Sequence, residues 1–354
     1  MTERQAYVAF NLAEGIGSVG VEALAKSAGS VVAAWDRYPK KVSRTGGEID
    51  LEEELALAKR RNVAILTPAD SEYPVRLRSV PGRPLALYVK GDASALSKPM
   101  VALVGTRRPS EYGLRMASRL ASELAESGWG VVSGLALGID AESHRAALEV
   151  GGVTVGVIGS GLDMFYPEEN IPLAREMVKK GGAVVSEFPF GRPPDRETFP
   201  IRNHVVAALA HGVVAVEAPS RSGTLITMSI AADLGRTVMA VPGRADSRHS
   251  AGCLQLIRDG AILVRNVDDI LEAMSELLPN VRKKTEGPVE RDPETPPYSP
   301  EEALVMLHSD KDGVSIDELV RLSGLSAERV NSVVMGLRIK GFIKFLPGNR
   351  VASL

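Results

Sequence analysis

Arginine is the residue whose placement points most clearly to chemistry in this chain. Four segments, at 105–110, 188–203, 218–223 and 242–250, are each expected to follow a β-strand, and they contain only three acidic residues. Eight arginines lie in or beside these segments, namely Arg107, Arg108, Arg192, Arg196, Arg202, Arg221, Arg244 and Arg248. A planar guanidinium donates two hydrogen bonds at once to a phosphate. The pattern predicts an arginine-rich groove for a polyanion, against the alternative that loops expose charged residues anyway.

Small residues in the same turns could bring backbone N–H groups to an anion. Ser222 is the expected N-cap of a helix, and the N–H groups of Gly223 and Thr224 would then point at a ligand. Glycine in a turn permits close backbone approach or a positive φ. Further candidate contacts of this kind follow other expected strands, at Gly105, Thr106, Ser133, Gly134 and Gly161.

Aromatic residues cluster near the second arginine segment. Four of the seven phenylalanines, Phe165, Phe188, Phe190 and Phe199, lie between positions 165 and 199. Cations that pair with phosphates, interleaved with rings on which unstacked bases rest, suit single-stranded nucleic acid, at roughly 1–3 kcal/mol per base. An aromatic side chain is more often part of a core than a stacking platform, and Phe188, at a strand end, is expected to be core. Phe165 is a candidate nucleic-acid contact.

Motifs of other chemistries are missing. There is no GxxxxGK[ST] of a P-loop, and residues 159–164 begin like a dinucleotide fingerprint but lack its third glycine. The five histidines show no HxH or HExxH spacing, and the single Cys253 excludes a cysteine-based zinc site. The carboxylates Asp140, Glu187 and Glu217 could orient arginines or bind a ribose, and nothing pairs them with a nucleophile. We therefore expect no cofactor, no metal and no catalytic residue.

Composition sets limits on class and compartment. The 354 residues carry a formal net charge of −2 and are 44% hydrophobic, so a large core can form and any basic site must be local. A single cysteine suits the reducing cytoplasm. The N-terminus lacks the pattern of a signal peptide, and no run reaches the roughly 18 to 20 apolar residues that cross a bilayer. We expect a cytoplasmic protein that does not associate with membranes.

The elements that must position the arginines alternate between apolar strands and amphipathic helices. Continuous apolar strands separated by helices are typical of a parallel sheet covered on both faces. The expected fold class is therefore α/β, with an extended Rossmann-like, mainly parallel sheet, whose ligand site lies at the carboxyl ends of the strands. Strands are expected at 101–104, 130–133, 154–158, 183–187, 213–217, 237–241 and 261–264, and helices at 113–127, 141–150, 171–180, 202–211, 222–234 and 253–259.

A small helical module is expected at residues 1–75, ahead of a Rossmann-like domain at 76–279. A glycine-rich turn at 15–20 joins two of its helices, and a third helix is expected at 51–61. This is the pattern of a helix-hairpin-helix that holds a DNA phosphate, or simply of a tight turn between helices. Short strands expected at 62–66 and 85–90 could add to the edge of the main sheet.

The C-terminal residues predict a linker and a third domain. Residues 280–299 are charged and proline-rich, which indicates a flexible linker. Residues 300–354 have the layout of a winged helix-turn-helix, with three helices followed by a β-hairpin. The third helix is only modestly basic, and a scaffold or dimerisation role is as good an interpretation as DNA reading. Its charged residues are Glu328, Arg329, Arg338 and Lys340.

Six ordered motifs in the central domain resemble those of the DprA/Smf family, the DNA-processing A proteins of bacteria. The resemblance covers about residues 60–275, and the two end domains match in layout. The motifs are Val104-Gly105-Thr106-Arg107, SGLALGID at 133–140, GLDMFYP at 161–167, Ser186-Glu187, Phe199-Pro200-x-Arg202-Asn203 and SGTLIT at 222–227.

This resemblance implies a protein without catalytic activity that binds single-stranded DNA regardless of sequence and loads RecA onto it, including during natural transformation. It also implies a homodimer formed through the Rossmann-like domain. DNA contacts carry over to Arg107 and Arg196, and Asn203 belongs to the same motif as Arg202. Glu168 and His204 stand where family members can carry a cation, and Arg192, Arg244 and Arg248 are candidates to compensate.

Two other functions remain open at the level of sequence. A nucleotide-handling enzyme of the phosphoribohydrolase kind needs a carboxylate and an arginine over a ribose, for which Glu217 and Arg107 are candidates. A transcription regulator would instead use the winged helix at a defined duplex site.

Overall fold

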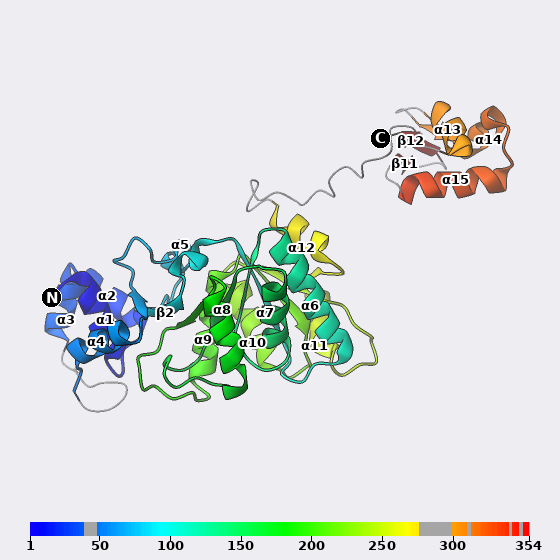
Figure 1. Cartoon of the computed structure of the whole chain (residues 1–354). Helices are drawn as coiled ribbons and strands as arrows, with labels where there is room; N and C mark the ends of the chain where they lie inside the picture. The colour runs from blue at the N-terminus through cyan, green and yellow to red at the C-terminus, as the bar shows by residue number, and fades with distance from the viewer. Residues whose placement is uncertain (39–47, 276–298, 310–312, 340–341, 347–349, 354) are drawn as a thin grey trace. The chain divides into compact units, whose positions relative to one another are not determined.

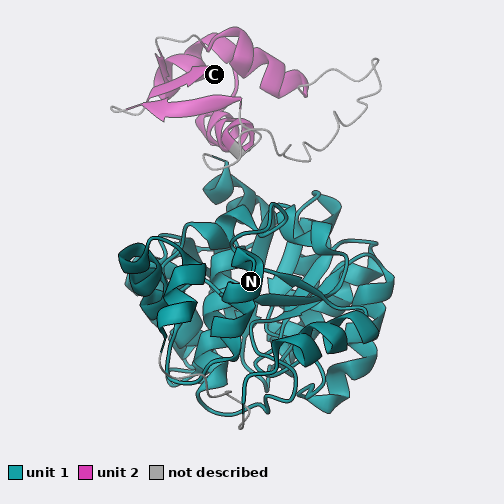
Figure 2. Ribbon diagram, turned by 90° about the vertical axis from the view of Figure 1, so that its left-hand side faces the viewer, with its two compact units in different colours: residues 1–283 teal, residues 284–354 magenta. Residues whose placement is uncertain are grey.

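The computed structural model describes residues 1–38, 48–275, 299–309, 313–339, 342–346 and 350–353. The chain forms two compact units, residues 1–283 and 284–354, which Figure 2 shows in teal and magenta. The expected domain boundary at residue 75 falls inside the first unit, and the expected linker at 280–299 lies, except for Ser299, outside the described residues. No helix in the described part of the chain is long and apolar enough to cross a membrane.

The first unit is built on one nine-stranded sheet with the order β1-β2-β6-β5-β4-β3-β7-β8-β9. The seven strands from β6 to β9 in this order run parallel, and β1 and β2 extend the sheet beyond β6 as antiparallel strands. The fold class expected from the sequence is confirmed, as are the two edge strands. The strands are β1 Ala64–Leu66, β2 Leu87–Gly91, β3 Met100–Gly105, β4 Gly130–Ser133, β5 Thr154–Val157, β6 Ala183–Ser186, β7 Gly212–Glu217, β8 Thr237–Ala240 and β9 Ile262–Leu263.

Helices cover both faces of this sheet, as the apolar strands require (Figure 1). On one face α6, α7 and α12 pack against Val101 and Leu103 of β3, and on the other α9, α10 and α11 pack around Ala102 and Val104. The helices are α5 Val75–Arg78, α6 Glu111–Glu126, α7 Ile139–Glu149, α8 Ile171–Lys179, α9 Thr198–Leu209, α10 Gly223–Asp233, α11 Ala251–Arg258 and α12 Val267–Met274, with short 3₁₀ helices at Ala93–Ser97 and Glu168–Asn170.

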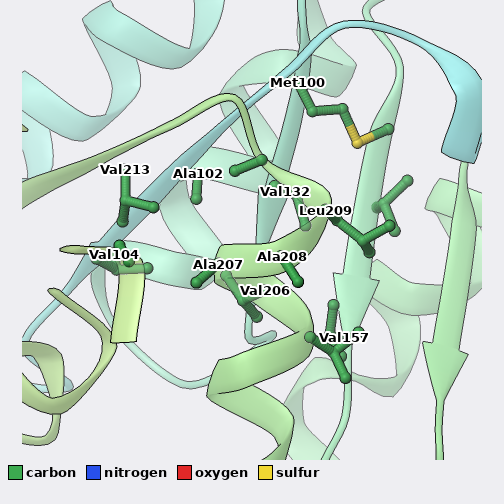
Figure 3. Packing of buried hydrophobic residues seen from close by; sticks show 14 of the residues in the cluster. Met100, Ala102, Val104, Val132, Val157, Val206, Ala207, Ala208, Leu209 and Val213 are labelled. Carbon is green, nitrogen blue, oxygen red and sulfur yellow. The ribbon is translucent and has the colours of Figure 1, made fainter. Parts of the chain in front are cut away.

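Helix α9 is held against the middle of the sheet by a run of apolar residues. Figure 3 shows Val206, Ala207, Ala208 and Leu209 pointing among side chains of β3, β4, β5 and β7. The helix begins four residues before the expected Arg202, because Asp195 Oδ1 accepts the N–H groups of Glu197 and Thr198 at 2.8 and 2.9 Å and organises the first turn. The earlier start places Phe199 and Arg202 on the same helix.

The N-terminal helices pack onto the sheet extension. They are α1 Glu3–Leu12, α2 Ser18–Ala28, α3 Val31–Arg37 and α4 Leu51–Arg60. The sequence did not predict α3, which packs Trp35 edge-on against Phe10 at a centroid distance of 5.0 Å. Val8 and Ala58 share a core with Tyr88 of β2, and Asn11 Nδ2 donates to the Glu187 carbonyl at 3.1 Å. These contacts tie the helical module to the segment that follows β6.

The second unit has the expected three helices and a small sheet. The helices are α13 Pro300–Leu307, α14 Ile316–Ser323 and α15 Ala327–Ile339, and the sheet has the order β10-β12-β11, with β10 Val314–Ser315, β11 Ile343–Leu346 and β12 Arg350–Ser353. Strand β10 is too short for a sequence pattern to reveal it. On α15, Arg329 is paired with Glu301 at 3.0 Å and Arg338 lies over the Phe345 ring, while Lys340 lies outside the described residues. The described cations of this helix are therefore engaged within the unit.

His144 is a buried polar group at the centre of the first unit, on α7. Its Nδ1 lies 2.6 Å from Thr154 Oγ1, and that hydroxyl donates to the Val131 carbonyl at 2.8 Å. The hydroxyl proton is thereby used, so Nδ1 must carry a proton and donate it to the Thr154 hydroxyl. Burial lowers the pKa of His144 to about 3, and the nearby charge of Arg145 acts in the same direction.

We expect His144 to make the protein less stable in acid. The unfolded state takes up a proton below its pKa of 6.5, whereas the folded state does so only near 3, so the free energy of unfolding falls as the pH drops from 6.5 towards 3. Urea unfolding measures how far the free energy of unfolding falls between pH 7 and pH 5. This decrease should be smaller for His144→Gln than for the wild type, by about 2 kcal/mol. Equal losses in the two proteins would contradict the buried neutral imidazole.

Candidate nucleic-acid interface

A groove of about 420 Å³ opens at the carboxyl ends of β3 and β7. These strands are neighbours in the sheet, but the chain leaves them in opposite directions, towards β4 on one side and β8 on the other. Such a switch point leaves a crevice that no connection crosses. The lining residues include Gly105, Thr106, Arg107, Gly134, Asp140, Arg196, Phe199, Arg202, Asn203, Arg221, Ser222, Gly223, Thr224, Ile226 and Thr227.

The turn after β3 forms one wall of the groove and is fixed from two sides. Thr106 donates its N–H to the Glu217 carbonyl of β7 at 2.8 Å, and its own carbonyl accepts the N–H of Ile139 at 3.3 Å. Gly138 sits against this carbonyl with φ +82° and ψ −125°, a conformation that only glycine adopts readily. A Cβ on Gly138 would collide with the Thr106 oxygen. The two turns therefore hold Arg107 in place together.

The base of the groove is organised around the buried guanidinium of Arg202. Its Nη1 donates to the carbonyls of Gly134 and, at 2.9 Å, Val157, and its Nε donates to Asn203 Oδ1 at 3.0 Å. A Cβ on Gly134 would lie 2.6 Å from Nη1, so only glycine leaves room for the arginine. Burial lowers the pKa of Arg202 to about 10, against the opposing charge of Asp140, and the side chain stays charged at neutral pH.

Asp140 faces the same turn from α7. Its Oδ2 accepts the N–H groups of Gly134 at 3.1 Å and Ala136 at 3.4 Å. Burial raises the pKa of this carboxyl, and the positive charge of Arg202 opposes the shift. Among the described residues that line the groove, Asp140 is the single acidic side chain, and it is engaged in holding the turn.

Phe199 contacts two arginines on the floor of the groove. The guanidinium carbons of Arg107 and Arg202 are 5.2 and 5.8 Å from its ring centroid. Tyr166, 45% exposed, lies 6.2 Å from the same ring. An exposed cation held over an aromatic face can bind a phosphate while the ring stays available to a base.

The helix start at α10 forms the opposite wall. Ser222 is its N-cap, as expected, and its Oγ accepts the N–H of Thr224 at 3.1 Å. The expectation that this N–H group is free for a ligand is therefore wrong, because the cap already uses it. Ile226 and Thr227, which were not expected from the sequence, lie one turn after Ser222 and Gly223 and so face the same groove.

The arginines differ in how far they are already neutralised. Arg107, Arg196 and Arg221 line the groove, are exposed, and have no carboxylate within 4.0 Å among the described residues. Outside the lining, Arg192 is paired with Asp195, and Arg244 with Asp246 at 2.9 Å. In the described part of the chain, only Arg107, Arg196 and Arg221 present an exposed, unpaired charge to the groove.

Four other candidate contacts lie away from the groove lining. Ser133 is fully buried, and its Oγ donates to the Leu103 carbonyl at 2.6 Å. Gly161 donates its N–H to the Arg192 carbonyl at 2.8 Å and is buried. Arg108 is exposed but not part of the lining, and Phe165 lines a separate apolar pocket. The roles of these four residues in DNA binding stay predictions. Ser133 and Gly161 are buried and do not lie on the open surface.

The carboxylate needed by a nucleotide-handling enzyme is placed elsewhere. Glu217 is 3% exposed and accepts the Ser110 hydroxyl and N–H at 2.6 and 2.8 Å, so it holds the N-cap residue of α6 instead of lining the groove with Arg107. The described residues contain no group of three or more His, Cys, Asp or Glu that could hold a metal ion.

Two family models match the chain. The first, described as DNA recombination-mediator protein A, matches residues 64–275, and the second, the DprA winged helix domain, matches residues 289–349. The chain belongs to the DNA recombination-mediator protein A family. The resemblance to the DprA/Smf family inferred from the motifs is therefore confirmed, and the winged helix with it.

Relatives of this family match over much of the chain. Protein Smf of Synechocystis is 30% identical over 99% of this chain and 98% of its own length. DNA processing protein DprA of Bacillus subtilis is 37% identical over 64% of this chain and 76% of its own. Among solved structures, DNA processing protein A of Streptococcus pneumoniae is 34% identical, with a TM-score of 0.60 over 77% of this chain and 93% of that one.

A second solved structure concerns DNA binding directly. DNA processing protein A of Helicobacter pylori, whose structure gives insight into its single-stranded DNA binding mode, is 29% identical, with a TM-score of 0.55 over 60% of this chain and 96% of that one.

We expect Gly138→Ala to destabilise the protein more than Gly151→Ala. Both glycines have a positive φ, but a Cβ at Gly151 meets nothing within 4 Å, whereas one at Gly138 strikes the Thr106 carbonyl. The strain alone costs about 1–2 kcal/mol, and the collision should add about 2 kcal/mol at Gly138. Urea unfolding measures the difference, and equal losses would show that the two turns do not depend on this contact.

Proposed function

We propose that this protein binds single-stranded DNA in the groove between β3 and β7, without sequence preference and without catalysis. The observation that carries the proposal is the set of three exposed, unpaired arginines, Arg107, Arg196 and Arg221, in one groove that holds a single, engaged carboxylate. Three unpaired cations in one groove suit a repeated anion rather than one phosphate.

Lack of sequence preference follows from the kind of contact available. The exposed arginines fit backbone phosphates, and Phe199 and Tyr166 offer rings, which accept any base because every base has a π-face. Sequence readout would need side-chain amides or carboxylates aimed at base edges. In the described lining, Asn203 is the one side-chain amide, and its Oδ1 is bound by Arg202.

The engagement of the acidic side chain in the groove favours a single strand over a nucleotide substrate. Catalysis on a ribose needs a carboxylate free to act, and Asp140 is instead bound to the backbone of the Gly134 turn. A relative of similar fold binds single-stranded DNA, which supports the same ligand for this chain. Arg192 and Arg244 could add phosphate contacts only by leaving their aspartates, so their contribution should be smaller.

We expect Arg107→Ala and Arg196→Ala each to weaken binding to a single-stranded oligonucleotide by about tenfold, because each removes a charge-assisted contact. The slope of log K against log salt should also shrink by about 0.7 per lost phosphate contact. Fluorescence anisotropy at two salt concentrations measures both quantities for an oligonucleotide of mixed sequence.

Arg119→Ala is the matched control for this experiment. Arg119 lies on α6, is exposed, is paired with Glu123 at 2.8 Å and does not line the groove. The substitution Arg119→Ala removes one positive charge from the protein, as Arg107→Ala does. If it weakened binding as much as Arg107→Ala, the effect would come from net charge, and the groove would not be the binding site.

We further propose that the bound strand is handed to RecA, in DNA uptake and recombination, by a homodimer formed through the Rossmann-like domain. The family model carries the description of a recombination mediator, which supports this role for the whole chain. A groove that holds phosphates through exposed arginines can release them stepwise, because each contact exchanges with counterions.

RecA loading predicts a kinetic effect. On a strand already coated with single-strand-binding protein, this protein should shorten the lag before RecA hydrolyses ATP, since RecA must otherwise wait for a bare stretch. With the double variant Arg107→Ala/Arg196→Ala, the lag should be as long as it is without this protein. Arg119→Ala should shorten the lag as much as the wild type does. An unaltered lag with the wild type would argue against loading, while DNA binding could still stand on the anisotropy result.

A further inference from the structure

We propose that a second pocket, beside α8, binds an acidic peptide segment that carries a bulky apolar side chain. The pocket, called here the α8 pocket, has a volume of about 380 Å³ and shares no lining residue with the groove. It is lined by Arg61, Val63, Lys90, Leu162, Phe165, Ile171, Ala174, Arg175, Val178, Val184 and Phe190.

The α8 pocket exists because the sheet is extended without an accompanying helix. Every parallel crossover brings a helix to the sheet, and α8 covers Val184 on β6 in this way. Strand β2 pairs with β6 as an antiparallel strand and brings no such helix, and its Lys90 lies directly opposite Val184. Beyond α8 the space is bordered by Arg61 and Val63, which follow α4, and by Phe190, which follows β6.

The walls of the α8 pocket are apolar. Six of the lining residues are aliphatic and two, Phe165 and Phe190, are aromatic. Phe165, Leu162, Ile171 and Val178 are half-buried, so part of their apolar surface faces solvent. An apolar hollow of this size at the surface of a protein is a usual place for an apolar side chain of a ligand or partner.

The charges at the rim have one sign. The lining holds Arg61, Lys90 and Arg175 and no acidic residue. Lys90 Nζ donates to backbone carbonyls at the end of α4, and Arg61 lies 5.3 Å from the Phe190 centroid and 3.4 Å from Asp163. Arg175 is exposed and has no carboxylate within 4.0 Å among the described residues. An acidic segment complements this rim, whereas a basic or neutral one does not.

The chemistry of the pocket therefore selects a peptide in which one large apolar residue is flanked by aspartate or glutamate. The apolar residue enters beside Phe165 and Val178, and the acidic residues lie along Arg175, whose charge is unpaired, while Arg61 already lies 3.4 Å from Asp163. Single-stranded DNA is a poorer occupant, because the hollow offers apolar walls where a backbone needs phosphate contacts. The pocket thus gives the protein a docking site for another protein that leaves the DNA groove open.

Binding of a labelled peptide tests the proposal. The probe is a fluorescein-labelled decapeptide with one phenylalanine among aspartates, titrated with the full chain and followed by anisotropy. We expect saturable binding, weakened about tenfold by Arg175→Glu, which reverses an unpaired rim charge. Phe165→Ala should also weaken it, by opening one wall. A peptide with serine in place of phenylalanine, and one with lysines in place of aspartates, should not bind.

Lys26→Glu is the matched control, because it makes the same charge change at an exposed helix position that does not line the pocket. The proposal fails if the wild type does not bind the probe at about 100 µM, a concentration that detects even weak docking. It also fails if Lys26→Glu weakens binding like Arg175→Glu, or if Arg175→Glu instead breaks a self-associated form seen by sedimentation. Loss of oligonucleotide binding in Phe165→Ala, with peptide binding intact, would assign the pocket to DNA.

Discussion

The candidate DNA site depends on one buried interaction, the contact of the Arg202 guanidinium with the carbonyls of Gly134 and Val157. A buried charge is costly unless hydrogen bonds replace the water that it loses. Here the ends of β4 and β5 supply them, so α9 cannot move without leaving a charge unsatisfied. Asp140 holds the same Gly134 turn by its N–H group. The floor of the groove is therefore fixed before any ligand arrives.

The arginines of the groove have two different roles. Arg202 is rigid and buried and supports the backbone, whereas Arg107, Arg196 and Arg221 are exposed and keep their donors for a ligand. Phe199 couples the two groups, since its ring lies under both Arg107 and Arg202. A guanidinium that rests on a ring loses less conformational freedom when it binds a phosphate. The groove is thus preorganised for anions by contacts that involve no anion.

Much of the fold and part of the site could be predicted from the sequence. The parallel strands are continuous apolar runs, and strand ends place Arg107 and Ser222 at the same edge, where the structure has them. Burial could not be predicted in the same way, because Arg202 and Arg196 look alike in a loop-and-helix segment. Nor could the sequence tell which side of its loop Phe165 takes. Those features depend on contacts with residues distant in the chain.

Both pockets arise where the chain departs from a simple repeat of strand, helix and parallel strand. At the switch point between β3 and β7, the connections run in opposite directions, and the groove lies between them. Backbone turns and unpaired arginines line this edge of the sheet. At the antiparallel extension, β2 pairs with β6 without a crossover helix, and an apolar pocket lies beside α8. The first departure exposes backbone and cations and suits a polyanion. The second exposes side-chain hydrocarbon under a basic rim and suits a protein segment, so one sheet can carry two ligands of different chemistry at once.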